Sequence, residues 1–149
     1  MNTKESNIYS EHFYPWFLPL TFFLPWFWKY GVVVGEDAIT FGYGISGPTK
    51  RGLCSHTISF QDIKKSSVST GCASITDNLL QFGGWGIRFS FRDKIWAYNA
   101  SLSGPYLELV EQHGENMTKY RIATQNPDLV ASIIVKTNNG LRQETKKYQ

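Results

Sequence analysis

The feature that most limits how this chain can fold is an aromatic run near its start. From Phe13 to Trp28 the sequence reads FYPWFLPLTFFLPWFW and holds no charged side chain. With Tyr30 included, the stretch contains ten of the 23 Phe, Tyr and Trp residues of the 149-residue chain. Exposing so much apolar surface to water is costly, so we expect a bilayer or a protein surface to cover it.

The length and the prolines of the run bear on how it meets a membrane. A helix of this length would rise about 24 Å, whereas the hydrocarbon core of a bilayer is about 30 Å thick. Pro19 and Pro25 would each remove a helical hydrogen bond, which predicts a kinked or broken helix. Aromatic residues at both ends are typical of membrane–water interfaces. Crossing, interfacial embedding and packing on protein stay open, and we favour membrane association.

We assign this association to the aromatic side chains of the run. They are Phe13, Tyr14, Trp16, Phe17, Phe22, Phe23, Trp26, Phe27 and Trp28. A mixed-charge stretch precedes the run and no small-residue cleavage site follows it, which argues against a cleaved secretory signal. Lys4 precedes the run, whereas Lys29, Lys50 and Arg51 follow it, and this bias places the β domain on the cytoplasmic or stromal side.

The rest of the chain is typical of one small β domain. Its composition, 42% hydrophobic and 18% charged residues, is that of a globular protein. Short β-type runs separated by turn residues precede a single helix. We expect a mainly β fold of about seven strands, a small sandwich or partly open barrel capped by the C-terminal helix. The expected divisions are a polar N-terminus (1–12), the aromatic segment (13–30), the β domain with its helix (31–138) and a polar tail (139–149).

The clearest strand signal is the run from Ile87 to Arg92. Apolar and polar residues alternate along it, which predicts a strand with Phe89 and Phe91 in the core and Arg88 and Arg92 in water. The next two residues, DK, offer a tight turn into a second strand at 95–98. The sequence therefore predicts a β-hairpin here.

A second hairpin and the only well-signalled helix follow. Residues 106–110 and 118–124 have strand composition, and Gly114 lies between them. Asn126 and Pro127 are typical of a helix start, whereas Asn139-Gly140 is typical of a helix end.

The body of the chain contains five short motifs: GGWGIR (83–88), AYN (97–99), SG (103–104), LEL (107–109) and IATQNP (122–127). In order and spacing they resemble an uncharacterised family of short membrane-anchored proteins whose soluble part is a bacterial pleckstrin-homology-like (PH-like) domain. The resemblance covers roughly 32–135 and implies a seven-stranded β architecture with a C-terminal helix. That family usually has two apolar membrane segments, where this chain has one proline-rich stretch. It brings no catalytic residues.

No catalytic, cofactor or metal site is supported by the residue spacings. No acid, base and nucleophile converge, so we expect a non-enzymatic protein without a cofactor. The GxGxxG match at 42–47 leads into β-type sequence, which favours a loop over a nucleotide site. Cys54, His56, Cys72 and His113 have poor spacing for a metal, and pairing of the two cysteines stays open. A net charge of +3 without Lys/Arg clustering argues against nucleic acid.

We therefore expect the protein to act by contact, as an interaction or scaffold subunit of a membrane complex with membrane lipid and a protein partner. Trp85, framed by Gly83, Gly84 and Gly86, suits a partner contact on a tight turn, with core packing as the alternative. One competing hypothesis is an anionic-lipid module that binds head groups through Lys50, Arg51, Lys64 and Lys65, and a second is an enzyme of unknown type.

Overall fold

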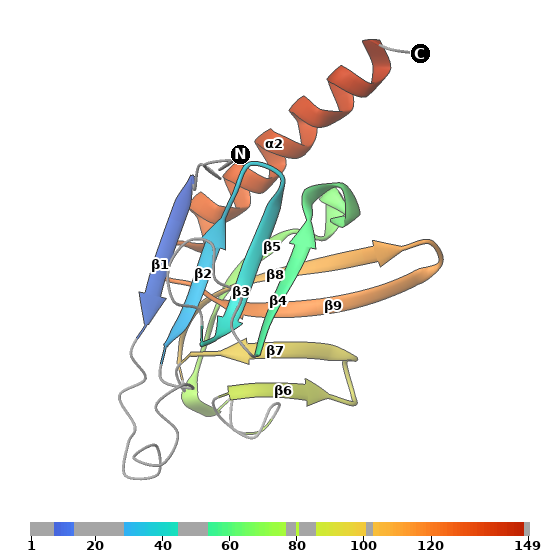
Figure 1. Cartoon of the computed structure of the whole chain (residues 1–149). Coiled ribbons are helices and arrows are strands. Elements are labelled where there is room, and N and C mark those ends of the chain that lie inside the picture. Colours follow the sequence, from blue (N-terminus) through green and yellow to red (C-terminus); the bar gives the residue numbers. More distant parts are fainter. Residues whose placement is uncertain are drawn as a thin grey trace.

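The computed structural model of the chain describes residues 8–13, 29–44, 54–76, 80, 86–100 and 103–147. Within these ranges the protein is mainly β: strands β1 to β9 form two sheets, and one long C-terminal helix packs beside them (Figure 1). The predicted sandwich of short strands with a C-terminal helix is confirmed. The described residues form nine strands instead of the expected number of about seven.

The first sheet is an antiparallel meander in the order β1-β2-β3-β4. Its strands are β1 (Tyr9–Phe13), β2 (Tyr30–Val34), β3 (Ala38–Tyr43) and β4 (Cys54–Ser59). The register places Tyr30 opposite Phe13 on one side and opposite Tyr43 on the other. The valines, isoleucines and aromatics of β2 and β3 are residues that fit a half-buried pleated surface.

Strand β1 lies in the stretch whose sequence indicated only a polar N-terminus. Its Glu11 is just 8% exposed, and the Glu11 carboxylate accepts hydrogen bonds from the Tyr9 hydroxyl at 2.8 Å and the Gln125 backbone N–H at 2.9 Å. Asn126 also donates to the Tyr9 hydroxyl at 3.0 Å. Contacts with residues more than 100 positions away therefore hold β1, and no local sequence pattern predicts these contacts.

The second sheet has the order β5-β8-β9-β7-β6. Its strands are β5 (Ser69–Ala73), β6 (Gly86–Ser90), β7 (Ile95–Asn99), β8 (Gly104–His113) and β9 (Asn116–Ala123). Neighbours are antiparallel except for β7 and β9, which run parallel. Both predicted hairpins, β6–β7 and β8–β9, are confirmed.

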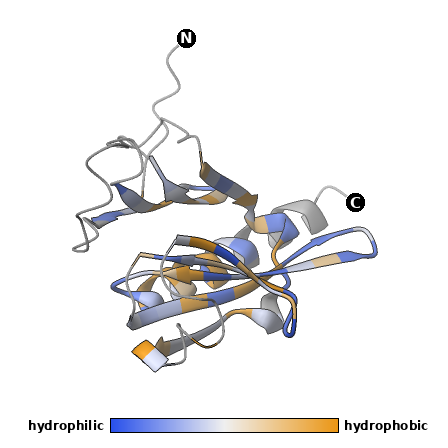
Figure 2. Ribbon diagram, turned by 90° about the horizontal axis from the view of Figure 1, so that it is seen from below, coloured by the Kyte–Doolittle hydropathy of each residue, from blue (hydrophilic) through white to orange (hydrophobic). Residues whose placement is uncertain are grey.

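The core lies between the two sheets and the helix. Figure 2 shows the hydropathy along the strands: buried and less buried residues alternate along β8, whereas every residue of β2 is buried. Phe41 is fully buried, and its ring packs edge-on against Tyr98 and Tyr120, with centroids at 4.8 and 5.8 Å. Val130 and Ile134 of the helix complete this cluster.

Helix α2 (Pro127–Lys147) begins where the sequence predicts and ends later. The predicted end at Asn139-Gly140 is wrong, because one glycine inside a helix costs only about 1 kcal/mol and strong helix formers follow it. Buried Asn138 fixes the helix to the chain after β4: its side-chain N–H group donates to the Phe60 carbonyl at 2.6 Å and the Ile63 carbonyl at 3.4 Å.

The register of the β6–β7 hairpin corrects one core prediction. Phe91 is 87% exposed, because β6 ends at Ser90 and Phe91 lies in the turn. Phe89 is half-buried, and Ser90 is the buried side chain of this strand end. Arg88 and Arg92 are exposed, as predicted.

Candidate functional site

Three segments that the sequence analysis singled out are flanked by strand ends at the same end of the domain. The aromatic run lies between β1 and β2, the segment with Lys50 and Arg51 lies between β3 and β4, and Trp85 precedes β6. These residues lie outside the described ranges, but the strand ends that flank them lie together (Figure 1). We call this the loop-bearing end: the last residues of β1, β3 and β7 and the first residues of β2, β4 and β6.

Tyr43 joins the two sheets at the loop-bearing end. Its hydroxyl donates to the carbonyl of Asn99 at the end of β7, and the Gly86 backbone hydrogen-bonds to the same hydroxyl. Its ring packs edge-on against that of Tyr30, with centroids 5.2 Å apart. One side chain therefore holds the starts of β2 and β6 and the end of β7 in fixed relation.

Burial keeps both of these tyrosines neutral. Desolvation raises the pKa of Tyr43, against smaller lowering effects from the Gly86 hydrogen bond and the Arg88 charge. Desolvation raises the pKa of Tyr30 well above its usual value, and the nearby Tyr43 and Glu11 raise it further. Both hydroxyls therefore keep their protons at neutral pH, and the Tyr43 hydroxyl remains a hydrogen-bond donor.

The chain leaves β1 and returns to β2 at neighbouring points. Phe13 pairs with Tyr30 across the sheet, and the Gly44 backbone N–H donates to the Lys29 carbonyl at 2.7 Å. Neighbouring strands lie about 4.8 Å apart, so the two strand ends that flank the aromatic run are next to each other in the first sheet. The nine side chains assigned to membrane contact lie outside the described side chains. In the part of the chain that the structure describes, no helix combines the length and apolar character needed to cross a bilayer.

Only one of the four candidate head-group cations, Lys64, has a described side chain. Lys50 and Arg51 lie outside the described ranges, and of Lys65 only the backbone is described, in the short helix η4 (Lys65–Ser67). Lys64 is exposed, and its backbone N–H donates to the Val110 carbonyl at 3.0 Å. Val110 is six residues from Gly104, the first residue of β8, so about 20 Å of strand separates the backbone contact of Lys64 from the start of β8.

The partner-contact turn is described only at Gly86. Gly86 has a φ of +101°, a left-handed conformation that glycine adopts without strain, and a Cβ there would meet nothing within 4 Å. Gly83, Gly84 and Trp85 lie outside the described ranges. The structure therefore shows a conformation that favours glycine at the first residue of β6, and the turn at 83–85 and the place of the Trp85 ring stay predictions.

A buried carboxylate, which the sequence did not reveal, joins the sheets away from the loop-bearing end. Glu111 is 7% exposed and accepts a hydrogen bond from the Tyr120 hydroxyl at 3.0 Å. Its two oxygens also lie 3.3 Å from His56 Nε2 and 3.1 Å from His113 Nε2. The His56 ring stacks on Tyr120 at 4.9 Å. Since these residues come from β4, β8 and β9, only the folded chain brings them together.

This cluster gathers two of the four residues considered for a metal, without making a metal centre. Cys54 and Cys72 lie on different sheets and both are free thiols. Among the described residues, no three His, Cys, Asp or Glu side chains are arranged to hold a metal ion. Glu111 connects Tyr120 of the second sheet with His56 of the first.

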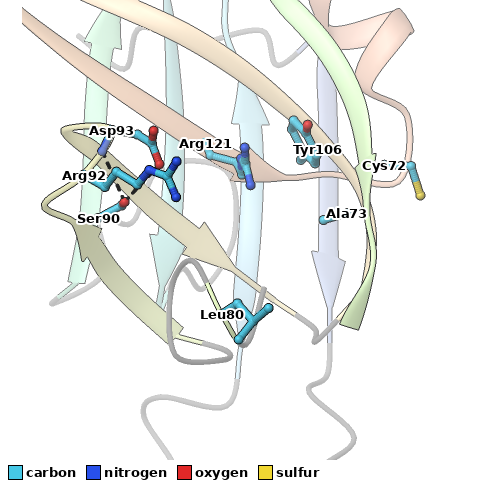
Figure 3. Close-up of a pocket in the computed structure, with 8 residues that line it drawn as sticks. All are labelled: Cys72, Ala73, Leu80, Ser90, Arg92, Asp93, Tyr106 and Arg121. Carbon is cyan, nitrogen blue, oxygen red and sulfur yellow. Dashed lines mark hydrogen bonds between the residues drawn. The ribbon is translucent and has the colours of Figure 1, made fainter. Parts of the chain in front are cut away.

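A cavity of about 470 Å³ opens on the outer face of the second sheet (Figure 3). Arg121 is buried there, paired with Glu108 at 2.7 Å, and lies 4.3 Å above the Tyr106 ring. Arg92 extends towards this space with Asp93 next to it. Among the described residues that line the cavity, Arg121 is therefore paired with a carboxylate, whereas Arg92 is exposed.

Comparison with known proteins adds no relative: no family model, no curated protein and no solved structure matches the chain.

Proposed function

We propose that this protein is a membrane-surface β domain that inserts its aromatic segment, 14–28, into the bilayer from one side and acts there by contact instead of catalysis. The main support for the proposal is the pairing of Phe13 with Tyr30. Because of this pairing, the two ends of the segment lie side by side in the first sheet.

Adjacent ends fit a segment that enters and leaves the same leaflet. A single crossing would have to separate its two ends by about 30 Å of hydrocarbon, and the β1–β2 register would then be lost. The Phe and Leu residues of the run supply about 3–4 kcal/mol of transfer free energy, enough for association. A loop held at both ends by a rigid sheet also loses less conformational entropy when it inserts than a free tail does.

The neighbouring segments support the same orientation. The segment with Lys50 and Arg51 starts from the end of β3, beside the start of β2. Each cation near an anionic surface contributes about 1 kcal/mol, so this pair would add to the attraction of the aromatic run. The Trp85 turn, attached through Gly86 to Tyr43, would then meet a protein partner at the membrane surface.

We also propose that the chain is related to the PH-like family that its motifs resemble. A four-stranded meander, a second sheet and a closing C-terminal helix fit the expected architecture. The nine described strands, against an expected number of about seven, and the parallel pairing of β7 with β9 depart from that architecture.

Replacing 14–28 by the three-residue turn Asn-Gly-Ser tests the proposed function. Because Phe13 and Tyr30 already pair, this turn with Lys29 forms a four-residue hairpin loop, and the sheet should survive. We expect the natural chain to float with phosphatidylcholine vesicles and the turn variant to stay in the dense fraction, with equal melting temperatures. A natural chain that does not float, or a turn variant that floats equally well, would refute the proposal.

A further inference from the structure

The β6–β7 hairpin carries an exposed row of aromatic rings. Phe91 is 87% exposed and Trp96 40% exposed, with the half-buried Phe89 between them. The Phe89 ring centroid lies 5.1 Å from that of Phe91 and 5.0 Å from that of Trp96. Large exposed aromatics at a hairpin tip mark a surface that something else covers.

The same hairpin also carries cations, of which Arg88 lies on the face of β6 opposite to Phe89. Arg88, Arg92 and Lys94 are exposed on the hairpin, whereas its only acidic residue is Asp93. The turn holds Asp93 in place, since the Asp93 backbone N–H donates to Ser90 Oγ at 3.4 Å and Ser90 Oγ donates to the Asp93 carboxylate at 3.3 Å. The hairpin tip therefore combines aromatic rings with a net positive charge.

We propose that this hairpin is a second membrane contact that selects anionic lipid: Phe91 enters the interfacial region while Arg92 and Lys94 bind lipid phosphates or carboxylates. Aromatic rings partition to the head-group level, and cations are attracted to an anionic leaflet. A second copy of this chain is a less suitable partner for this surface, because the three cations of one hairpin would repel the three cations of the other. The proposal rests on the membrane association proposed above and names its lipid class.

The fold allows both contacts at once. β6 is the edge strand of its sheet, with Gly86 at the loop-bearing end and Ser90 at the hairpin tip. In Figure 1, β6 runs along the lower side of the domain, on the side where β1 ends and β2 begins. β6 is five residues long and spans about 15 Å, so one flat surface along it reaches both places.

Vesicle flotation with two lipid compositions tests the proposal separately from the proposed function. The full chain is compared on phosphatidylcholine vesicles with and without phosphatidylserine. The variants are Phe91→Ser and the double change Arg92→Gln with Lys94→Gln. Met117→Ser is the control for an exposed apolar residue, and Lys136→Gln is the control for an exposed cation.

We expect phosphatidylserine to strengthen binding of the natural chain, and the double change to reduce that binding roughly 10- to 30-fold without altering binding to neutral vesicles. Phe91→Ser should weaken binding several-fold without shifting the melting temperature, because the ring is exposed. Binding that does not depend on phosphatidylserine, or equal losses in the two control variants, would overturn the hairpin proposal alone. Failure to bind either vesicle would instead refute the proposed membrane association.

Discussion

Phe13 and Tyr30 lie opposite each other in adjacent antiparallel strands and close the chain around residues 14–28. This pairing gives a segment whose composition resembles that of a short transmembrane stretch neighbouring start and end points on the first sheet. Tyr30 is completely buried and packs against Tyr43, which joins the second sheet. The strand ends that flank the most apolar segment of the sequence are thus held by buried contacts.

Removing the Tyr43 hydroxyl should loosen the loop-bearing end. Tyr43→Phe keeps the ring but leaves the Asn99 carbonyl and the Gly86 backbone without this partner, and we expect a loss of about 1–2 kcal/mol in the free energy of unfolding. Urea denaturation measures the loss. Tyr43→Leu, which also alters ring packing, should cost more, and equal stability of the natural chain and Tyr43→Phe would show that the hydroxyl does not join the sheets.

Alkaline pH should destabilise the fold through its buried tyrosines. Tyr30 and Tyr43 have pKa values raised above the usual 10.0 by burial, so above about pH 10 the unfolded chain loses protons that the folded chain keeps. Their contribution is fully present below that pH and declines as the pH rises towards the folded pKa, by about 1.4 kcal/mol per pH unit for each tyrosine. Denaturation curves at pH 9 to 12 should show the decline, and Tyr43→Phe should make it shallower. A stability that is flat over this range would contradict the burial of these hydroxyls.

Gly42 should tolerate no side chain. Its φ is +137°, and a Cβ would meet the Cys54 carbonyl and lie 2.6 Å from Ser55 Cα, both of which are backbone atoms. We expect Gly42→Ala to cost on the order of 3 kcal/mol or more, whereas Gly114→Ala, at φ +60° with open space around it, should cost about 1 kcal/mol. Thermal melting of the two variants gives the comparison. Similar melting temperatures would mean that β3 and β4 are not as close as described.

The features that sequence predicts here are those encoded by nearby residues. Alternation revealed the β6–β7 hairpin, and Asn126-Pro127 marked the helix start within a residue. The same alternation misplaced Phe91, because where a strand ends depends on the turn, and here Ser90 and Asp93 close the turn one residue earlier.

The features that sequence could not predict depend on distant partners. Strand β1 has the polar sequence YSEHF and is held by hydrogen bonds to Gln125 and Asn126. Glu111 is buried because it contacts His56 and Tyr120, which lie on other strands. The aromatic run was recognisable from its composition. That its two ends lie together follows only from the register of β1 with β2.

Asn138 should be essential for docking the helix. Its side-chain N–H group donates to two backbone carbonyls in a buried site, so Asn138→Ala should cost about 1–3 kcal/mol. Asn138→Asp should be worse, because it adds a buried charge and removes both donors. Ser132→Ala, on the exposed face of the same helix, is the control and should change little. Melting temperatures that rank the three variants differently would contradict this docking contact.

The central claim, that the aromatic segment enters and leaves one side of the membrane, can be tested by labelling its two flanks. Ser10→Cys and Lys29→Cys place single thiols at exposed positions before and after the segment, in a chain whose Cys54 and Cys72 are replaced by serine. The protein is bound to sealed vesicles, recovered by flotation and treated with a maleimide that cannot cross the bilayer. We predict that both thiols react equally, with and without detergent. Reaction of one thiol only, with the other protected until detergent opens the vesicles, would show that the segment crosses the membrane and would contradict the account.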